Sequence, residues 1–466
     1  MKGIEIMDLT DFNSSGAFII GLSDCGEKIT GAGGRVSTQE GTVLSIFAKS
    51  QDDEKNAKLI DKVTRSGHNS VVEHTYYNLA FQNVSTVCEQ FIIEFRLASF
   101  TVKSRRYVNF SDAGFYIPNF NNEDMKKSYE KHMSSLFSLY TEFCENGIAK
   151  EDARFLLPYC LFSNFFCSIN GREFLHLLKA MIFGRGSKFP EIKALGLELL
   201  EQAKKMTPGI MTDFEQRNEF SNHDNPDFSF LNLPKRKENG EKVELLSYTK
   251  DATKIVCRSA LVSYSNIASD DIEKIIEDKE NTSKIIAEIM SCERPRPLEA
   301  VSFTFRYNKV SLSGITHFAR HRMQSLDVPQ LTKTDRESYI IPPSISDKPE
   351  LLEKYENAFK NNAKEYNRLK ALGISEEDLV YYQLSGNTLD IVSTMNAREL
   401  ILFLRLRTCT RAQWEVREYA IDALQMLRKV EPQIFKFYGP SCYIDRCPEG
   451  KFSCGRMAEM KEFFSK

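Results

Sequence analysis

The sequence predicts an α+β fold made of two homologous domains, each a mixed or antiparallel sheet packed with helices. Three observations predict this fold. A long segment of the chain occurs twice, each copy contains an alternation of apolar residues that is typical of a strand, and helical spacing follows in other segments.

The duplication is visible as identical residues at one constant offset. Glu73 and Glu299 stand 226 positions apart (299 minus 73). The same offset relates four further pairs: Arg96 and Arg322, Ser99 and Ser325, Asn170 and Asn396, Arg172 and Arg398. Several pairs in the same order indicate duplication rather than chance. The period is far too long for a solenoid array, so two homologous domains are expected.

Each copy carries one clear strand. The stretch VVEHTYYNLAF, around Glu73, has apolar residues at every second position from Tyr77 to Phe81. Its counterpart PLEAVSFTFRY, around Glu299, alternates in the same way from Val301 to Phe305. This alternation predicts a half-buried strand in both copies.

Two segments predict helices. Apolar residues recur at helical spacing over residues 410–430, with Thr410 as the expected N-cap and Pro432 just past the end. Residues 310–322 also have a helical pattern. On such a helix His317 would share one face with Arg320 and His321, because it stands three and four positions before them.

The chain divides into four parts. Residues 1–220 form the first repeat and residues 243–437 the second. The polar segment 221–242 contains two prolines and a glycine and is the expected linker. Residues 438–466 form a tail that contains three cysteines.

Composition excludes several classes of protein. The chain of 466 residues is 42% hydrophobic and 27% charged, which is typical of a soluble globular protein. Its net charge of -2 gives no electrostatic reason to expect nucleic acid as a partner. No apolar run approaches the roughly 20 residues that a membrane helix needs, so no membrane association is expected. The start has no signal-peptide pattern, which favours a cytoplasmic protein with its eleven cysteines reduced.

The strongest candidate for chemistry is the cationic triplet Arg320, His321 and Arg322, with Ser325 three positions further on. Arginine offers a planar fork of donors that suits a phosphate or a pyrimidine carbonyl, and serine adds a neutral donor. A lone triplet of this kind is more often a solvated basic patch. The motifs that follow it in the second repeat favour an anionic ligand instead.

RHRMQS, followed by TMNARELILFLRLRTCTRAQWEVREYA, resembles the flavin-dependent thymidylate synthase family, whose signature is RHR-x2-S-x4-S-x-R and then N-x-R and an AQWEIR helix. The resemblance extends over both halves except the linker and the tail. It implies a flavin-dependent thymidylate synthase-like fold in each half. It also implies an enzyme that uses FAD, takes its carbon from methylene-tetrahydrofolate and its electrons from NADPH, and methylates C5 of dUMP to give dTMP.

The same resemblance assigns roles to individual residues. Arg407, eleven positions after Asn396, corresponds to the catalytic arginine that orients the pyrimidine. The implied cofactor-binding residues, which would hold FAD, are Arg320, His321, Arg322, Ser325, Asn396 and Arg398. The implied substrate-binding residues are Ser104, Arg106, Arg154, His317, Arg320 and Arg407, with His317 in place of a family glutamine.

Each repeat lacks what the other retains. The first has Phe95 and Met181 where the second has His321 and Arg407. The second has Gln330 and Thr332 in place of Ser104 and Arg106, and it lacks the arginine that corresponds to Arg154. In the family each nucleotide site is shared between two subunits along this same division. The resemblance therefore implies composite sites made from both repeats, in a homodimer that forms a pseudo-tetramer.

One family residue is absent from both repeats. Val102 and Val328 stand where the family has a glutamate close to flavin and nucleotide. Two alternatives therefore stay open: a related flavin and folate methylase of another pyrimidine nucleotide, and a non-catalytic nucleotide-binding homologue. Comparing turnover of dUMP with turnover of UMP distinguishes the first alternative from a dUMP methylase. Flavin absorbance distinguishes the second alternative from a flavoenzyme.

Two secondary signals have competing interpretations. Cys442, Cys447 and Cys454 are candidate zinc ligands, with a fourth ligand from Cys257, Cys292 or Cys409; the alternative is a set of reduced surface thiols. The glycine-rich segment 26–36 lacks a dinucleotide-binding pattern, so a flexible loop is expected there rather than a phosphate-binding loop.

Overall fold

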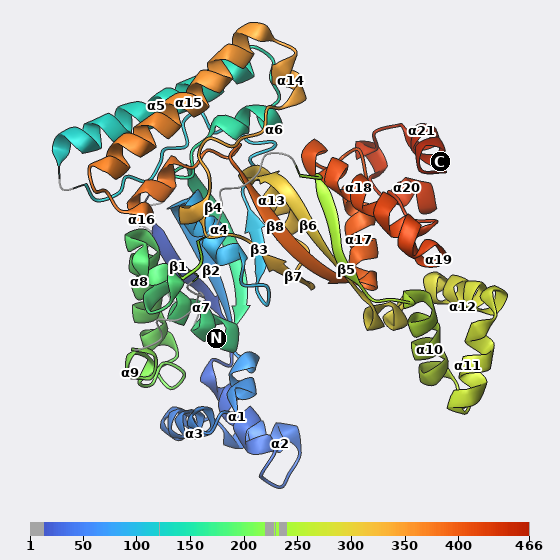
Figure 1. Cartoon of the computed structure of the whole chain (residues 1–466). Helices are drawn as coiled ribbons and strands as arrows, with labels where there is room; N and C mark the ends of the chain where they lie inside the picture. The colour runs from blue at the N-terminus through green and yellow to red at the C-terminus, as the bar shows by residue number, and fades with distance from the viewer. Residues whose placement is uncertain (1–13, 121, 220–227, 229, 233–239, 466) are drawn as a thin grey trace. The chain divides into compact units, whose positions relative to one another are not determined.

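The computed structural model describes residues 14–120, 122–219, 228, 230–232 and 240–465 (Figure 1). It divides into two compact units, which are Met1–Pro234 with Pro342–Ser385, and Lys235–Ile341 with Gly386–Lys466. We refer to them as unit 1 and unit 2. Residues 342–385 come from the second predicted repeat but pack in unit 1, so the sequence boundaries of the repeats remain a prediction.

Each unit contains a four-stranded antiparallel sheet, which confirms the predicted α+β class. In unit 1 the strand order is β1 (Gly16–Leu22), β2 (Tyr76–Ser85), β4 (Phe162–Asn170) and β3 (Ser99–Val102). In unit 2 the order is β5 (Val243–Tyr248), β6 (Ser302–Ser311), β8 (Thr388–Asn396) and β7 (Gln324–Asp327). The two sheets have the same order of equivalent strands.

The register of the two sheets is also the same. Tyr76 pairs with Asn170 in unit 1, and Ser302 pairs with Asn396 in unit 2, each 226 positions later. The central strand is irregular at one equivalent point in both sheets, where Asn83 has φ 48° and Lys309 has φ 58°. The predicted alternation is confirmed in both strands. Every second side chain is buried from Tyr77 to Phe81, and so are the side chains of Phe303 and Phe305.

Helices pack against each sheet within its own unit. In unit 1, α7 contacts β2 and β4 while α8 contacts β1; in unit 2, α17 contacts β8 while α18 contacts β5 and β6 (Figure 1). The helices of unit 1 are α1 (Glu27–Val36), α2 (Val43–Lys49), α3 (Asp53–Arg65), α4 (Thr86–Ile93), α5 (Glu123–Glu145), α6 (Lys150–Ala153), α7 (Gly171–Ile182), α8 (Pro190–Met206), α9 (Phe214–Asn218), α14 (Pro343–Ser346), α15 (Pro349–Ala371) and α16 (Glu376–Leu379). Those of unit 2 are α10 (Ala252–Tyr264), α11 (Ser269–Glu277), α12 (Lys279–Ser291), α13 (Leu312–Phe318), α17 (Ala397–Arg407), α18 (Trp414–Val430), α19 (Pro432–Phe435), α20 (Ser441–Ile444) and α21 (Met457–Ser465).

Short 3-10 helices complete the connections. They are η1 (Asn69–His74), η2 (Arg154–Leu156), η3 (Arg185–Lys188) and η6 (Val380–Tyr382) in unit 1, and η4 (Arg296–Ala300), η5 (Leu331–Lys333) and η7 (Gly450–Phe452) in unit 2.

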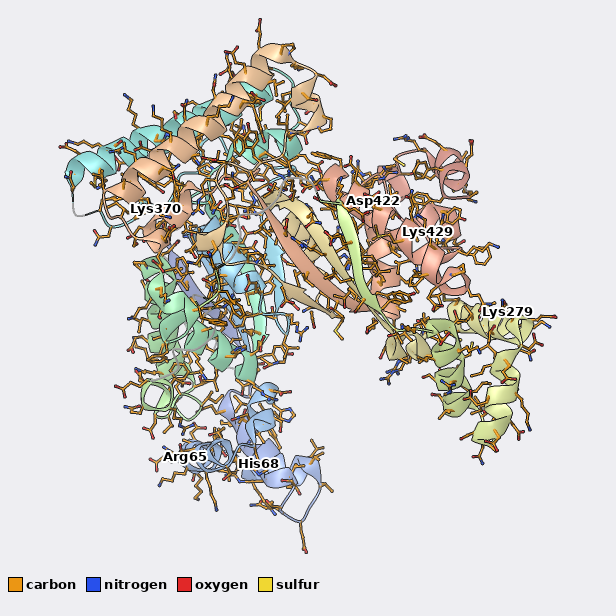
Figure 2. All side chains as sticks on the ribbon, in the orientation of Figure 1. Arg65, His68, Lys279, Lys370, Asp422 and Lys429 are labelled. Atoms are coloured by element: carbon orange, nitrogen blue, oxygen red, sulfur yellow. The ribbon has the colours of Figure 1, made fainter. Side chains whose placement is uncertain are left out.

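Arg65, whose side chain is labelled in Figure 2, joins the end of α3 to the start of α9. It pairs with Asp61 on its own helix and with Asp213. Among the described residues, no helix has both the length and the apolar character to cross a membrane.

The long helices of the two repeats lie side by side in unit 1. α5 and α15 have the same length and the same position in their repeats, and Figure 1 shows them packed along one another. His132 Nε2 lies 3.0 Å from Asn362 Oδ1, and Ser128 Oγ lies 3.5 Å from Glu365 Oε1. A helix of the second repeat therefore completes the helical layer of unit 1.

Three local predictions were wrong. The cap of the last long helix is Gln413, whose side chain accepts from Val416 N, and not Thr410, because the chain after Arg407 turns before α18 begins. The helix predicted over residues 310–322 ends at Phe318, so Arg320 and His321 lie in the following turn. The glycine-rich segment forms α1, because a Cβ on Gly31 would meet Asn56 Oδ1 at 2.4 Å, and glycine permits this close contact.

A buried ion pair holds α4 in unit 1. Arg105 donates two hydrogen bonds to Glu89, at 2.7 and 3.0 Å, and the two side chains are 9% and 2% exposed. We expect Glu89→Ala to lower the free energy of unfolding by about 3 to 5 kcal/mol, because it leaves the guanidinium buried without a counter-charge. Lys55→Ala at the exposed Lys55–Asp52 pair is the control, with an expected change below about 1 kcal/mol. Chemical denaturation measures both, and equal losses would contradict the prediction.

Candidate functional site

The cationic triplet lies in the turn between α13 and β7. Ser311 begins α13 by accepting a hydrogen bond from Gly314 N at 2.9 Å, and the helix ends three residues before His321. Arg320 and Arg322 are exposed, whereas the His321 ring is 3% exposed. The turn therefore presents its two arginines to solvent and directs its histidine into unit 2.

His321 joins Glu399 to Arg407. Its Nδ1 lies 3.1 Å from Glu399 Oε1, and its Nε2 accepts a hydrogen bond from Arg407 Nε at 3.0 Å. Arg407 Nη2 also donates to the backbone oxygen of His317 at 3.1 Å. The structure therefore brings three predicted residues together, and one of them, His321, also contacts a carboxylate that the sequence analysis did not select.

The direction of these hydrogen bonds fixes the state of His321. Arginine has only donors, so Nε2 must accept, and the proton of the neutral ring is then on Nδ1, facing Glu399. Burial lowers the pKa of His321; the contact with Glu399 opposes this shift, and the positive charges of Arg407 and Arg320 reinforce it. His321 is therefore neutral at pH 7, and its ring is a fixed acceptor for Arg407.

Asn396 and Arg398 occupy structural positions that both repeats share. Asn396 caps α17 by accepting from Glu399 N at 2.9 Å, and Arg398 pairs with Glu299 at 2.5 Å. In unit 1 Asn170 caps α7 in the same way, and Arg172 pairs with Glu73 at 2.7 Å. The predicted cofactor role of Asn396 and Arg398 stays a prediction. Ser325 is exposed on β7, and the side chain of His317 is buried.

The equivalent place in unit 1 is apolar. Phe95 and Met181, the counterparts of His321 and Arg407, are 5% and 0% exposed. The Phe95 ring packs against His176 with 5.1 Å between ring centroids. Arg185 pairs with Glu94 and lies over the Phe91 ring, 4.6 Å from its centroid. Aromatic and apolar side chains in unit 1 therefore occupy the positions that His321 and Arg407 hold in unit 2.

A second group of predicted residues comes together in unit 1, around Glu151. Arg106 Nε and Nη2 lie 3.0 and 3.1 Å from its two carboxylate oxygens, and Arg154 Nε donates to its backbone oxygen at 3.0 Å. Ser104 Oγ accepts from Arg106 N at 3.3 Å. Arg154 is 3% exposed, so its position is fixed by the fold. All three substrate-binding residues predicted in the first repeat are thus neighbours.

Sequence reasoning missed Glu399 and Glu151. Glu399 and its counterpart Glu173 were visible as a repeated acidic residue in the NARE and NGRE motifs, three positions after the asparagine. A carboxylate at this position is typical of a helix N-terminus, so the pattern alone does not indicate contact with a histidine. For Glu151 no comparable signal exists, since its contact with Arg106 depends on tertiary packing.

The tail cysteines lie near Cys409. Burial raises the pKa of Cys409, and the nearby thiols of Cys454 and Cys447 act in the same direction. In the part of the chain that the structure describes, no group of three or more His, Cys, Asp or Glu side chains could hold a metal ion. The zinc predicted at Cys442, Cys447 and Cys454 therefore stays a prediction.

Comparison with known proteins identifies the family. The model described as "Thymidylate synthase complementing protein" matches residues 22–209 and matches again over residues 244–433. The chain belongs to this family. The double match confirms the predicted duplication, and the two matches include both groups of site residues.

Individual members of this thymidylate synthase family each match about half of the chain. A flavin-dependent thymidylate synthase from Clostridium tetani is 37% identical over 243 residues, which are 48% of this chain and 97% of the relative. One from Geobacter sulfurreducens is 33% identical over 227 residues, with the same two shares. One from Saccharolobus solfataricus is 38% identical over 208 residues, 43% of this chain and 78% of the relative. These names confirm the predicted resemblance to flavin-dependent thymidylate synthases.

A solved structure with a related description is the UMP/dUMP methylase PolB from Streptomyces cacaoi, bound with 5-Br dUMP. It is 20% identical, covers 45% of this chain and 98% of its own, and has a TM-score of 0.39. At this TM-score the likeness carries no argument about the site.

Proposed function

We propose that this protein is a flavin-dependent thymidylate synthase that methylates C5 of dUMP, with methylene-tetrahydrofolate as the carbon donor and NADPH as the reductant. The observation that supports this proposal most is the hydrogen-bonded chain Glu399–His321–Arg407, built on motifs of the family. It holds one guanidinium in a fixed orientation, as recognition of a planar pyrimidine requires.

The donors of the RHR turn fit an anionic cofactor such as FAD. Arg320 and Arg322 are exposed on the same turn, and Ser325 is exposed at the start of β7. Two cations beside a neutral donor suit the diphosphate of a dinucleotide. When bound, FAD would supply the hydride chemistry, while the protein supplies binding and orientation.

Arg407 is the proposed catalytic residue. Its guanidinium is held by His321 and by the backbone of His317, so it needs no reorganisation when charge develops on a bound pyrimidine. A preorganised cation at such a carbonyl stabilises the transition state more than the ground state. This role requires no enzyme nucleophile.

Ser104, Arg106 and Arg154 are the proposed phosphate-binding residues. They cluster in unit 1, and their counterparts in the second repeat are missing, whereas Arg407 and His321 are present in the second repeat alone. We infer that each nucleotide site is composite and takes residues from one first repeat and one second repeat. The proposal includes a cytoplasmic homodimer that forms a pseudo-tetramer of four repeats.

The test of the proposed function is direct. Purified protein is expected to carry a flavin absorbance and to convert dUMP to dTMP when methylene-tetrahydrofolate and NADPH are both present. Omission of either co-substrate is the control and is expected to abolish turnover. A colourless protein that binds dUMP without turnover would identify a non-catalytic homologue instead.

A methylase of another pyrimidine nucleotide is the second candidate, because Val102 and Val328 replace the family glutamate. Measuring kcat/KM for dUMP and UMP under identical conditions decides between the two. We expect dUMP to be the better substrate, and a preference for UMP would reverse the assignment.

A further inference from the structure

Arg407 donates two hydrogen bonds, one to the backbone oxygen of His317 and one to His321 Nε2. Of these two acceptors, only His321 can change its protonation state. The backbone oxygen of His317 is always an acceptor, but His321 Nε2 accepts only when the ring proton is on Nδ1. In the other tautomer, or in the protonated ring, Nε2 would point a proton at the Nε proton of Arg407. The orientation of Arg407 therefore depends on which nitrogen of His321 carries the proton.

Glu399 is placed to decide this. It stands in the first turn of α17, where Asn396 Oδ1 holds its backbone N–H at 2.9 Å, and it is 8% exposed. Its Oε1 lies 3.1 Å from His321 Nδ1. A carboxylate has no proton to donate, so this contact stabilises the tautomer with the proton on Nδ1. The N-terminus of a helix also favours negative charge.

We propose that Glu399 is a positioning residue which selects the Nδ1–H tautomer of neutral His321 and thereby orients Arg407. The inference rests on the proposed function for the role of Arg407. Glu399 acts on a substrate only through His321, since its carboxylate is turned to the ring.

The equivalent glutamate of unit 1 shows that the place at the start of the helix and the contact with a His–Arg pair are two different features. Glu173, the counterpart of Glu399, is also 8% exposed, and its backbone N–H is held by Asn170 at 2.9 Å. The ring at the position of His321 is Phe95, and Met181 replaces Arg407. Glu173 instead contacts the exposed His176, at 3.4 Å. Both glutamates take part in the same helix start, but Glu399 alone contacts a histidine that holds an arginine.

The test uses Glu399→Gln, with Glu173→Gln as the matched control. Glutamine preserves shape and helix start but can donate to Nδ1, so both tautomers of His321 become accessible. We expect kcat for dUMP to fall about 10- to 100-fold in Glu399→Gln, by analogy with the carboxylates that orient metal-bound histidines. We expect a change below about twofold in Glu173→Gln, since Phe95 and Met181 stand in unit 1 where His321 and Arg407 stand in unit 2.

A second readout does not depend on turnover. Nitrogen-15 NMR of histidine-labelled protein, with the His321 signal assigned by its loss in His321→Gln, is expected to show the Nδ1–H tautomer in the wild type and a mixture in Glu399→Gln. An Nε2–H tautomer in the wild type, or equal losses of kcat in the two glutamine variants, would overturn the inference. If the wild type fails to turn over dUMP, the proposed function fails, and the tautomer measurement still decides the inference.

The pH profile provides a further check in the same variants. The charged groups that face His321 are Glu399 and Arg407 on α17 and Arg320 in its own turn. Because Glu399 raises the pKa of His321 against the effect of burial, its loss is expected to move the acid limb of kcat to lower pH. An unchanged acid limb in Glu399→Gln would contradict the link to His321.

Discussion

Arg407→Lys is expected to lower kcat for dUMP by about 100- to 1,000-fold, because loss of a preorganised transition-state donor typically has this effect. The structure gives a physical reason why lysine cannot substitute. Arg407 uses Nε and Nη2 to contact His321 and the backbone of His317 simultaneously. A single ammonium cannot reproduce this fork, so the cation would lose its orientation.

Arg405→Ala is the matched control for this prediction, because Arg405 is an exposed arginine on the same helix, one position after Leu404. We expect Arg405→Ala to leave kcat within about twofold of the wild type, as for surface substitutions away from a site. Steady-state kinetics measure the effect on catalysis. The bound flavin and the melting temperature, measured in parallel, show whether the variant is folded. If Arg407→Lys retained more than a tenth of wild-type kcat, Arg407 would not be the catalytic residue.

The second large effect is expected from Arg106→Gln. Loss of one charge-assisted contact to phosphate is worth about 1.5 to 3 kcal/mol, so kcat/KM for dUMP should fall about 10- to 150-fold, mostly through KM. Because Arg106 also pairs with Glu151, the variant Glu151→Gln/Arg106→Gln is measured beside it. The same loss in both variants would attribute the effect to phosphate rather than to an unpaired Glu151.

Arg96→Ala is the control in the first repeat, since Arg96 is the counterpart of Arg322 but lies beside Phe95 rather than a histidine. We expect kcat/KM to stay within about twofold of the wild type in this variant, as at other exposed positions. A loss in Arg96→Ala as large as that in Arg106→Gln would contradict the proposed division of roles between the repeats.

Much of the fold could be predicted because the chain contains its own comparison. The pairs at one offset indicated two homologous domains, and the alternation around Tyr77 and Phe303 indicated their central strands. The roles predicted for Arg320, His321 and Arg322 stay predictions. The alternation is a local pattern, and it occurs in both repeats at the same offset.

Features that depend on tertiary packing were not predicted. The glycine-rich segment reads as a loop by composition, yet it forms α1, because Gly31 packs against Asn56, a residue 25 positions away (56 minus 31). The packing of α15 beside α5 in unit 1 joins residues of different repeats, which no local pattern indicates. The role of Glu399 was hidden because its spacing to Asn396 has a sufficient explanation in helix capping.

The measurement that tests the central claim most directly is kcat/KM for dUMP in Arg106→Gln, Arg407→Lys and the double variant. If the nucleotide sites are composite, each single substitution damages every site, and each should lose at least about tenfold. If each repeat instead carried its own complete site, each single substitution would leave roughly half of the wild-type activity, and only the double variant would lose nearly all of it. The composite account predicts the first result, and the second would contradict it.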